Sequence, residues 1–424
     1  MAKTPGPNDP TTYAASVGSV REWPDDLESA EQDLALEPAR RRRRAAPFFI
    51  VCRVFFGLLS AAALAAMSIV YLRVDELDSS KNTTDAVTVA QRGQAATPPD
   101  DGANDILIVG NDSRTDMQGN PLSAELLREL RTEATSTLNT DTLILLRIPR
   151  NGGRGAAISI PRDTSVKVPG LAKEEKINGA FGITKALTER RLADGGETDR
   201  KKIARKSDDA GRTALIQAVQ GLTGVRVDHY TEVSLYGFYL LTEVIDGVDV
   251  CLNHSTSDPD SGASFAAGPQ TVRGGDAVAF VRQRKNLPRG DLDRIVRQQT
   301  FLASAMNKVL SGDLLTNNAK LNALEDAVSK SVVMDRGLHF LELVSQAQAL
   351  ASGRVRFVTI PVTGVGARND RGQSIITVDV PAVHKYVRGL LSAKPPAPAA
   401  PVKFGSAPLL DLRGSGRAAA PCVD

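Results

Sequence analysis

Short apolar runs alternate with longer stretches of helical periodicity along the chain beyond residue 104. Runs rich in Val, Ile and Leu indicate strands, and apolar residues repeating at three- and four-residue steps indicate amphipathic helices. The predicted strands are residues 105–109, 142–148, 156–160, 229–233, 248–252, 354–360 and 374–378. The predicted helices are residues 123–133, 180–191, 211–223, 235–245, 274–282, 291–310, 321–330, 338–351 and 381–391. We therefore expect an α/β fold with α-β-α layers, in which helices cover a mixed central sheet.

The first part of the chain has a different pattern. Residues 1–39 hold eight acids and two bases, residues 40–44 are five consecutive arginines, and residues 54–72 form an uncharged apolar run of nineteen. At about 1.5 Å per residue, such a run is long enough to cross a hydrocarbon layer of about 30 Å. We expect one transmembrane helix here, against two alternatives: a buried core helix, or a cleaved signal peptide suggested by the small residues at 61–66.

The arginine run also predicts the topology, because positive charge stays on the cytoplasmic side of a membrane helix. The expected protein is a single-pass cell-membrane protein with a cytoplasmic N-terminus. The expected segments are a disordered acidic and Arg-rich tail (1–45), a transmembrane anchor (46–73), a polar linker (74–104), an extracytoplasmic catalytic domain (105–391) and a flexible Pro/Ala-rich tail (392–424). The highly charged stretch 194–209 is expected to be an exposed insertion.

Overall composition excludes two classes. With 52 basic and 49 acidic side chains the net charge is +3, too small for a uniformly basic nucleic-acid binder, so no nucleic-acid partner is expected. Three cysteines cannot build a disulfide-rich scaffold. Cys251 and Cys422 both fall on the expected outer side, where they could form a disulfide; the alternative is a buried thiol at Cys251 and a free one at Cys422.

The densest candidate chemistry lies in residues 273–297, where seven bases accompany three acids and six of the bases are arginines. One guanidinium group can bind two phosphate oxygens at once, and it stays charged at physiological pH. We interpret the segment as a phosphate-binding cluster, against the alternative of a solvated surface. Its candidate residues are Arg282, Arg284, Arg294, Arg297 and Gln298, with Asp291 able to orient the arginines.

A second set of polar residues follows the early strands. Asp112 lies in the turn after the first predicted strand, and Asp141 enters the second. Two such carboxylates, together with phosphate oxygens and water, would suffice for Mg²⁺, although an aspartate beside a turn more often caps backbone amides. Arg162 and Asp163 follow the third strand, where a structural salt bridge is the alternative to a role in the site.

Taken in order, these motifs resemble the LytR-CpsA-Psr family of cell-wall glycopolymer ligases, of the actinobacterial type. The resemblance rests on residues 110–114, 140–142, 159–164, 176–181, 222–247, 281–284 and 290–299. Three positions depart from the family pattern: Asn139 and Thr140 stand where Arg and Ser are common, and Phe181 where Tyr is common.

The resemblance implies a phosphotransferase that moves a glycopolymer from a polyprenyl-pyrophosphate carrier to a muramic acid hydroxyl of peptidoglycan, as a phosphodiester. Its expected partners are that lipid-linked glycopolymer, peptidoglycan and the lipid bilayer, and its expected cofactor is Mg²⁺ on Asp112 and Asp141. The expected catalytic residues are Arg162, Asp163, Arg282, Arg284, Asp291 and Arg294. The expected pyrophosphate-binding residues are Arg162, Lys176, Arg282, Arg284, Arg294, Arg297 and Gln298. Two other functions remain open: a polyprenyl-pyrophosphate phosphatase, and a membrane-bound regulator of the envelope or of transcription.

Overall fold

The computed structural model describes residues 82–92, 98–115, 120–132, 138–311, 317–339, 342, 355–392 and 421–424. The predicted transmembrane anchor, residues 46–73, lies outside the described residues. Among the helices that the structure does describe, none combines the length and the apolar character that a membrane crossing requires.

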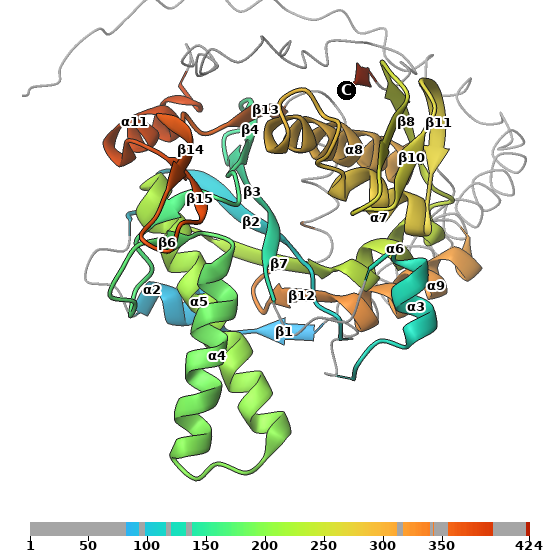
Figure 1. Ribbon diagram of the computed structural model, residues 1–424. Coiled ribbons are helices and arrows are strands. Elements are labelled where there is room, and N and C mark those ends of the chain that lie inside the picture. Colours follow the sequence, from blue (N-terminus) through green and yellow to red (C-terminus); the bar gives the residue numbers. More distant parts are fainter. Residues whose placement is uncertain are drawn as a thin grey trace, which may run out of the picture. The chain divides into compact units, whose positions relative to one another are not determined.

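A mixed sheet forms the centre of the described chain (Figure 1). Its strand order is β1 (Asn82–Thr84), β12 (Val332–Asp335), β7 (His229–Ser234), β2 (Ala103–Asn111), β3 (Thr140–Pro149), β4 (Gly155–Ser159) and β13 (Val355–Thr359). The strand β2 runs parallel to β7 and antiparallel to β3, and β3 runs antiparallel to β4. The expected mixed α/β sheet is therefore present.

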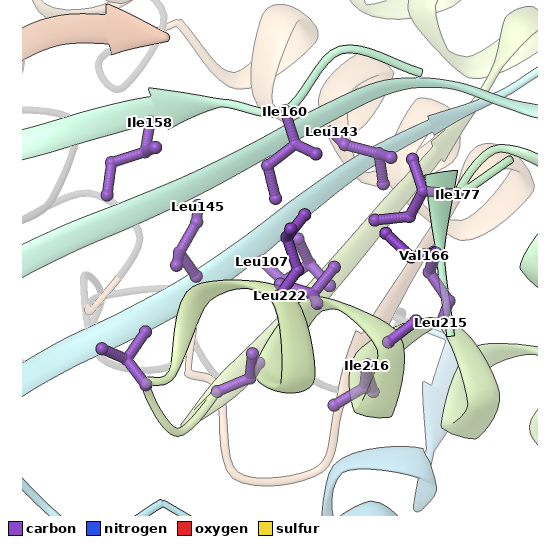
Figure 2. Close-up of a cluster of buried hydrophobic side chains, with 14 of the residues drawn as sticks. Leu107, Leu143, Leu145, Ile158, Ile160, Val166, Ile177, Leu215, Ile216 and Leu222 are labelled. Atoms are coloured by element: carbon purple, nitrogen blue, oxygen red, sulfur yellow. The ribbon is translucent and has the colours of Figure 1, made fainter. Parts of the chain in front are cut away.

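Helices cover both faces of the sheet because the central strands are apolar on both sides. In β2, Leu107 and Val109 face one layer, while Ile106 faces the other. The first layer contains α2 (Ala86–Arg92), α5 (Arg200–Thr223) and α11 (Val380–Gly389). Figure 2 shows its core, with Leu215, Ile216 and Leu222 of α5 lying against the strand residues. The second layer contains α6 (Leu235–Val244), α8 (Asp291–Ser311) and α9 (Asn318–Ser331). The arrangement is the expected α-β-α layering.

A smaller sheet packs against α7 (Gly274–Arg282) and α8 around a third apolar cluster. It has the order β11 (Gly268–Val272), β8 (Val248–Leu252) and β16 (Cys422–Val423). Cys251 and Cys422 face each other in neighbouring strands and form a disulfide, the first of the two possibilities that the sequence leaves open. Part of the expected flexible tail is thus fixed: residues 421–424 belong to a sheet, while residues 393–420 lie outside the described chain.

The remaining short elements connect these layers. They are α3 (Ala124–Glu129), β5 (Ser165–Val166), β6 (Glu175–Lys176), α4 (Gly179–Asp194), β9 (Thr256–Asp258), β10 (Ala263–Phe265), β14 (Gly364–Arg368) and β15 (Ser374–Thr377). The antiparallel pair β5–β6 lies in the connection from β4 to α4.

Two expectations need correction. The linker expected over 74–104 contains β1 and α2, so the domain begins at least as early as Asn82. The polar side chains of β1 do not indicate a strand in the sequence, because Asn82 and Thr84 bond to elements that are distant in the chain.

The stretch 194–209 is mostly exposed, as expected. It is not separate from the helix predicted at 211–223, because α5 starts at Arg200, where Asp199 caps two backbone amides. Most of the helix predicted at 338–351 lies outside the described residues.

Candidate functional site

The sheet topology brings three predicted site residues to one edge. Asp112 follows the end of β2, Asp141 lies at the start of β3, and Arg162 follows the end of β4. Because β3 is antiparallel to both neighbours, its first residues lie beside the last residues of β2 and β4. Arg162 donates a hydrogen bond from its terminal nitrogen to Asp141 Oδ1 at 2.6 Å. The acid and the arginine, 21 residues apart in sequence, thus form one ion pair at the sheet edge.

The first turn of α8 completes this group from the second helical layer. Asp291 Oδ1 lies 2.6 Å from a terminal nitrogen of Arg294, 3.7 Å from Arg162 Nε and 3.7 Å from Arg284 Nε. Arg294 is buried, Arg162 is half-buried and Arg284 is half exposed. Three guanidinium groups therefore surround one carboxylate, and they approach it from a strand end, a loop and a helix.

This cluster carries more hydrogen-bonding capacity than its members use. Both carboxylate oxygens of Asp291, Arg162 Nε and Arg294 Nε are buried without a hydrogen-bond partner. The close approach of Arg294 to Asp291 is a charge contact rather than an aligned hydrogen bond. Burial, only partly offset by Asp291, lowers the pKa of Arg294 to about 10. Since unpaired buried donors are costly, the free Nε–H groups of Arg162 and Arg294 are suited to an anionic ligand with oxygen acceptors.

The two candidate metal ligands are close enough to interact. Asp112 Oδ1 accepts a hydrogen bond from the backbone amide of Asn139 at 2.8 Å. Burial raises the pKa of Asp112 and the nearby charge of Asp141 raises it further, while the Asn139 amide opposes the shift. Within the described residues, no group of three or more His, Cys, Asp or Glu is placed to hold a metal ion. The two carboxylates are hard oxygen donors, which would suit a hard cation that takes its remaining ligands from phosphate oxygens and water.

Arg282 lies close enough to these carboxylates to interact with them electrostatically. It donates to the backbone carbonyls of Leu130 and Arg131 at 3.4 and 3.3 Å. Burial lowers its pKa, and the nearby charge of Arg114 lowers it further, against the attraction of Asp141 and Asp112. Arg282 thus interacts electrostatically with both acids.

Lys176 and Gln298 support the site from its margins. Lys176 Nζ lies 2.8 Å from Asp163 Oδ1, and Asn178, two residues later, donates its backbone amide to the carbonyl of Arg162 at 3.1 Å. Gln298 Nε2 donates to the carbonyl of Val281 at 3.1 Å, directly before Arg282. In this arrangement both side chains bond to protein groups next to the arginines.

Arg297 is the predicted site residue that the structure removes from the set. Its guanidinium donates to Gln283 Oε1 and to the backbone carbonyl of Asp424, both at 2.6 Å, and it lies over the ring of Phe280 at 5.1 Å. The side chain is buried. Helical spacing places Arg297 three residues from Arg294 but cannot reveal that the distant residues 421–424 contact its guanidinium group.

A buried polar network beneath the site was not found from the sequence. Glu232 of β7 accepts hydrogen bonds from Arg212 Nε at 2.8 Å, from the Tyr230 hydroxyl at 2.7 Å and from Asn111 Nδ2. Asn111 Oδ1 in turn accepts from the backbone amide of Ser113 at 3.0 Å, so the network fixes the turn that carries Asp112. The available signal was an acid inside an apolar strand, which needs a buried partner.

Comparisons with known proteins identify the family to which the chain belongs. Residues 69–388 match the model of the LytR_cpsA_psr family. The chain is 46% identical over 351 residues to the cell wall biosynthesis protein LcpA of Corynebacterium glutamicum, covering 82% of this chain and 67% of LcpA. It is 28% identical over 197 residues to the polyisoprenyl-teichoic acid–peptidoglycan teichoic acid transferase TagU of Bacillus mycoides, covering 44% of this chain and 56% of TagU.

Among solved structures, B. subtilis TagV aligns with a TM-score of 0.47 and 21% identity, over 69% of this chain and 97% of TagV. The family match covers most of the chain, and the identity to LcpA extends over four fifths of it. The chain belongs to the LytR-CpsA-Psr family.

Proposed function

We propose that this protein is a membrane-anchored phosphotransferase that moves a glycopolymer from a polyprenyl-pyrophosphate carrier to a muramic acid hydroxyl of peptidoglycan. The observation that carries the proposal is the convergence of Arg162, Arg284 and Arg294 on Asp291, with buried polar atoms left unpaired beside two carboxylates. The names of the relatives, a cell wall biosynthesis protein and a teichoic acid transferase, support the same class of reaction.

In the proposed reaction, the acceptor hydroxyl oxygen attacks the phosphorus that carries the glycopolymer. A new oxygen–phosphorus bond forms, the bond from that phosphorus to the bridging oxygen breaks, and polyprenyl phosphate leaves with the bond electrons. The hydroxyl proton passes to a base or to water. Such a transfer requires charge neutralisation and positioning more than covalent assistance, which the arginines supply through fixed donors in a site partly removed from solvent.

Asp112 and Asp141 are the residues that would hold Mg²⁺. When bound, the cation would neutralise developing charge on the phosphate oxygens. Asp141 has a second task, because it orients Arg162 by a direct hydrogen bond. Asp291 orients the arginines on the opposite side, and Lys176 holds Asp163 next to Arg162.

The membrane location is part of the proposal. Residues 54–72 would anchor the chain in the bilayer that also holds the polyprenyl carrier. Tethering would confine enzyme and lipid substrate to one surface and raise their effective concentration. An aspartate of the site or a water molecule would accept the proton of the attacking hydroxyl.

The test is an acceptor assay with the full-length protein in detergent, a polyprenyl-pyrophosphoryl glycan, Mg²⁺ and peptidoglycan. We expect polymer to become covalently linked to peptidoglycan, and Arg284→Ala to lose at least about 100-fold of this activity. Arg388→Ala is the matched control, since Arg388 is an exposed arginine on α11. Release of phosphate or free polymer without any peptidoglycan-linked product would replace the transferase by a phosphatase.

A further inference from the structure

The helices α4 and α5 form a hairpin that extends beyond the sheet (Figure 1). We call its outer part, residues 186–206, the helical arm. In the first layer, α5 buries Leu215 and Val219 against the sheet, but the helical arm has only exposed or half-buried residues. The arm therefore contributes little apolar burial to the fold.

The exposed surface of the helical arm is strongly basic. Its exposed charged residues are Arg190, Arg191, Arg200, Lys201, Arg205 and Lys206 against Asp194 and Asp199. None of these six basic side chains has an ion-pair or hydrogen-bond partner in the described chain. By contrast, Lys202 pairs with Glu197, and Lys185, just before the arm, pairs with Asp208 at 2.6 Å. Most of the bases on the arm therefore lack a partner among the described residues.

These free charges do not help the helix to form. Lys201 and Arg205, which both lack a partner in the described chain, are four residues apart on α5. Like charges at this spacing repel and destabilise a helix by a few tenths of a kcal/mol per pair. A cationic surface that opposes its own folding and has no partner within the chain is suited to an anionic partner outside it.

The base of the arm lies next to the first described residues of the chain. Thr84 of β1 donates its hydroxyl to Asp209 Oδ1 at 2.7 Å, and Gln217 Nε2 contacts the carbonyl of Ala90 at 3.5 Å. Only ten residues separate Thr84 from the expected end of the anchor at residue 73. Ten residues span at most about 35 Å, and the ten residues of α5 from Arg200 to Asp209 rise about 15 Å. The arm is therefore within reach of a membrane surface.

Both helices of the arm also lead to the candidate site. The helix α4 starts at Gly179, three residues after Lys176, and Asn178 bonds to the backbone of Arg162. Arg212 of α5 pairs with Glu232, which holds the turn before Asp112. A contact at the arm would consequently orient the arginine cluster and the two carboxylates together.

We propose that the helical arm binds the phosphate groups of anionic lipid headgroups at the outer face of the cell membrane. This contact would set the orientation of the site toward its lipid-linked substrate. The inference rests on the proposed function for the anchor in the bilayer. The short tether favours lipid over the glycopolymer as the occupant, because it limits how far the arm can move from the membrane.

The experiment uses full-length protein in nanodiscs with a fluorophore at the arm tip. The label is placed by Thr198→Cys in a Cys52→Ser background, since Cys251 and Cys422 are bonded to each other. A headgroup-attached nitroxide lipid reports proximity by quenching. We expect at least about twofold more quenching with phosphatidylglycerol than with phosphatidylcholine discs, and loss of the difference near 1 M salt, where the screening length is about 3 Å.

Two charge-reversed proteins complete the test. The arm variant changes Arg191, Arg200, Lys201 and Arg205 to Glu and is expected to remove the difference between the two lipids. The matched control changes four exposed bases outside the arm, Arg154, Lys167, Lys385 and Arg388, and is expected to retain it. Circular dichroism verifies that both remain folded.

Equal quenching in the two lipids, or a response only when soluble teichoic acid is added to phosphatidylcholine discs, would overturn the proposal. The acceptor assay tests polymer transfer to peptidoglycan separately. An arm variant that loses lipid-dependent quenching but still links polymer in detergent would support lipid binding by the arm and would leave the transferase proposal standing. A wild-type chain that shows the quenching difference but links no polymer would refute the transferase and not the arm.

Discussion

Replacing Glu232 by Gln tests whether the buried network holds the candidate site together. Glu232 is fully buried between Arg212, Tyr230 and Asn111. The amide keeps the shape but removes the charge, so Arg212 loses its buried partner and keeps only the longer contact with the half-buried Asp209, at 3.4 Å. Breaking a buried ion pair in this way costs about 3–5 kcal/mol. At roughly 2–4 °C per kcal/mol for a domain of this size, the melting temperature should fall by about 6–20 °C.

The matched control is Asp326→Asn. Asp326 pairs with Lys330 at 2.7 Å on the exposed side of α9, where an ion pair contributes less than about 1 kcal/mol. Circular dichroism melts and urea titrations of both variants give the comparison. A loss for Glu232→Gln no larger than that of the control would refute the account of the network.

The same variant predicts a pH dependence with a defined sign. Burial opposes ionisation of Glu232, but Arg212 and the hydrogen bonds outweigh it and lower the pKa below the ordinary 4.5. The charged group therefore stabilises the fold above about pH 4.5, and this stabilisation is lost as the pH falls through the lowered pKa. The difference in the free energy of unfolding between wild type and Glu232→Gln should be largest at pH 7 and should decrease below pH 4.5. A gap that stays constant into acid would contradict the assignment.

Further substitutions test the site, the disulfide and an edge of the sheet. Asp141→Ala and Arg282→Ala should each reduce polymer transfer by at least about 100-fold while shifting the melting temperature by less than about 4 °C, as measured by the acceptor assay and by melts. Cys422→Ser opens the link across 171 residues to Cys251 and should lower stability by about 2–5 kcal/mol, and a reducing agent should leave this variant unchanged. Burial opposes protonation of His229, but Asp335 outweighs it and raises the His229 pKa above 6.5. Protonated His229 thus contributes to stability below pH 6.5, and this contribution is lost as the pH rises through the raised pKa. The free energies of unfolding of His229→Gln and wild type, from urea titrations, should therefore converge at alkaline pH.

The sequence predicts the central strands well because β2, β3 and β4 are apolar on both faces and bounded by polar turns. It misses β1, a strand of three residues whose Asn82 and Thr84 look like linker residues until their partners are known. Strand β12 is missed for a related reason: its four residues continue directly from α9 without a turn residue to mark the change.

The candidate site also includes residues that can be predicted from the sequence and a contact that cannot. Arg162, Asp141 and Asp112 are predictable because motifs at strand ends meet at one sheet edge when the strands are antiparallel neighbours. Arg297 is not, because its partners Gln283 and Asp424 are 14 and 127 residues away and only the folded chain brings them together. Local spacing cannot separate an arginine that faces a site from one that closes a buried contact.

The central claim is that one arginine cluster at the sheet edge binds the pyrophosphate of the lipid-linked substrate. A crystal structure of the full-length protein with polyprenyl pyrophosphate and Mg²⁺ tests it most directly. We predict phosphate oxygens within hydrogen-bond distance of Arg162, Arg284 and Arg294, and the cation between the pyrophosphate and the carboxylates of Asp112 and Asp141. A pyrophosphate bound away from these arginines would contradict the claim.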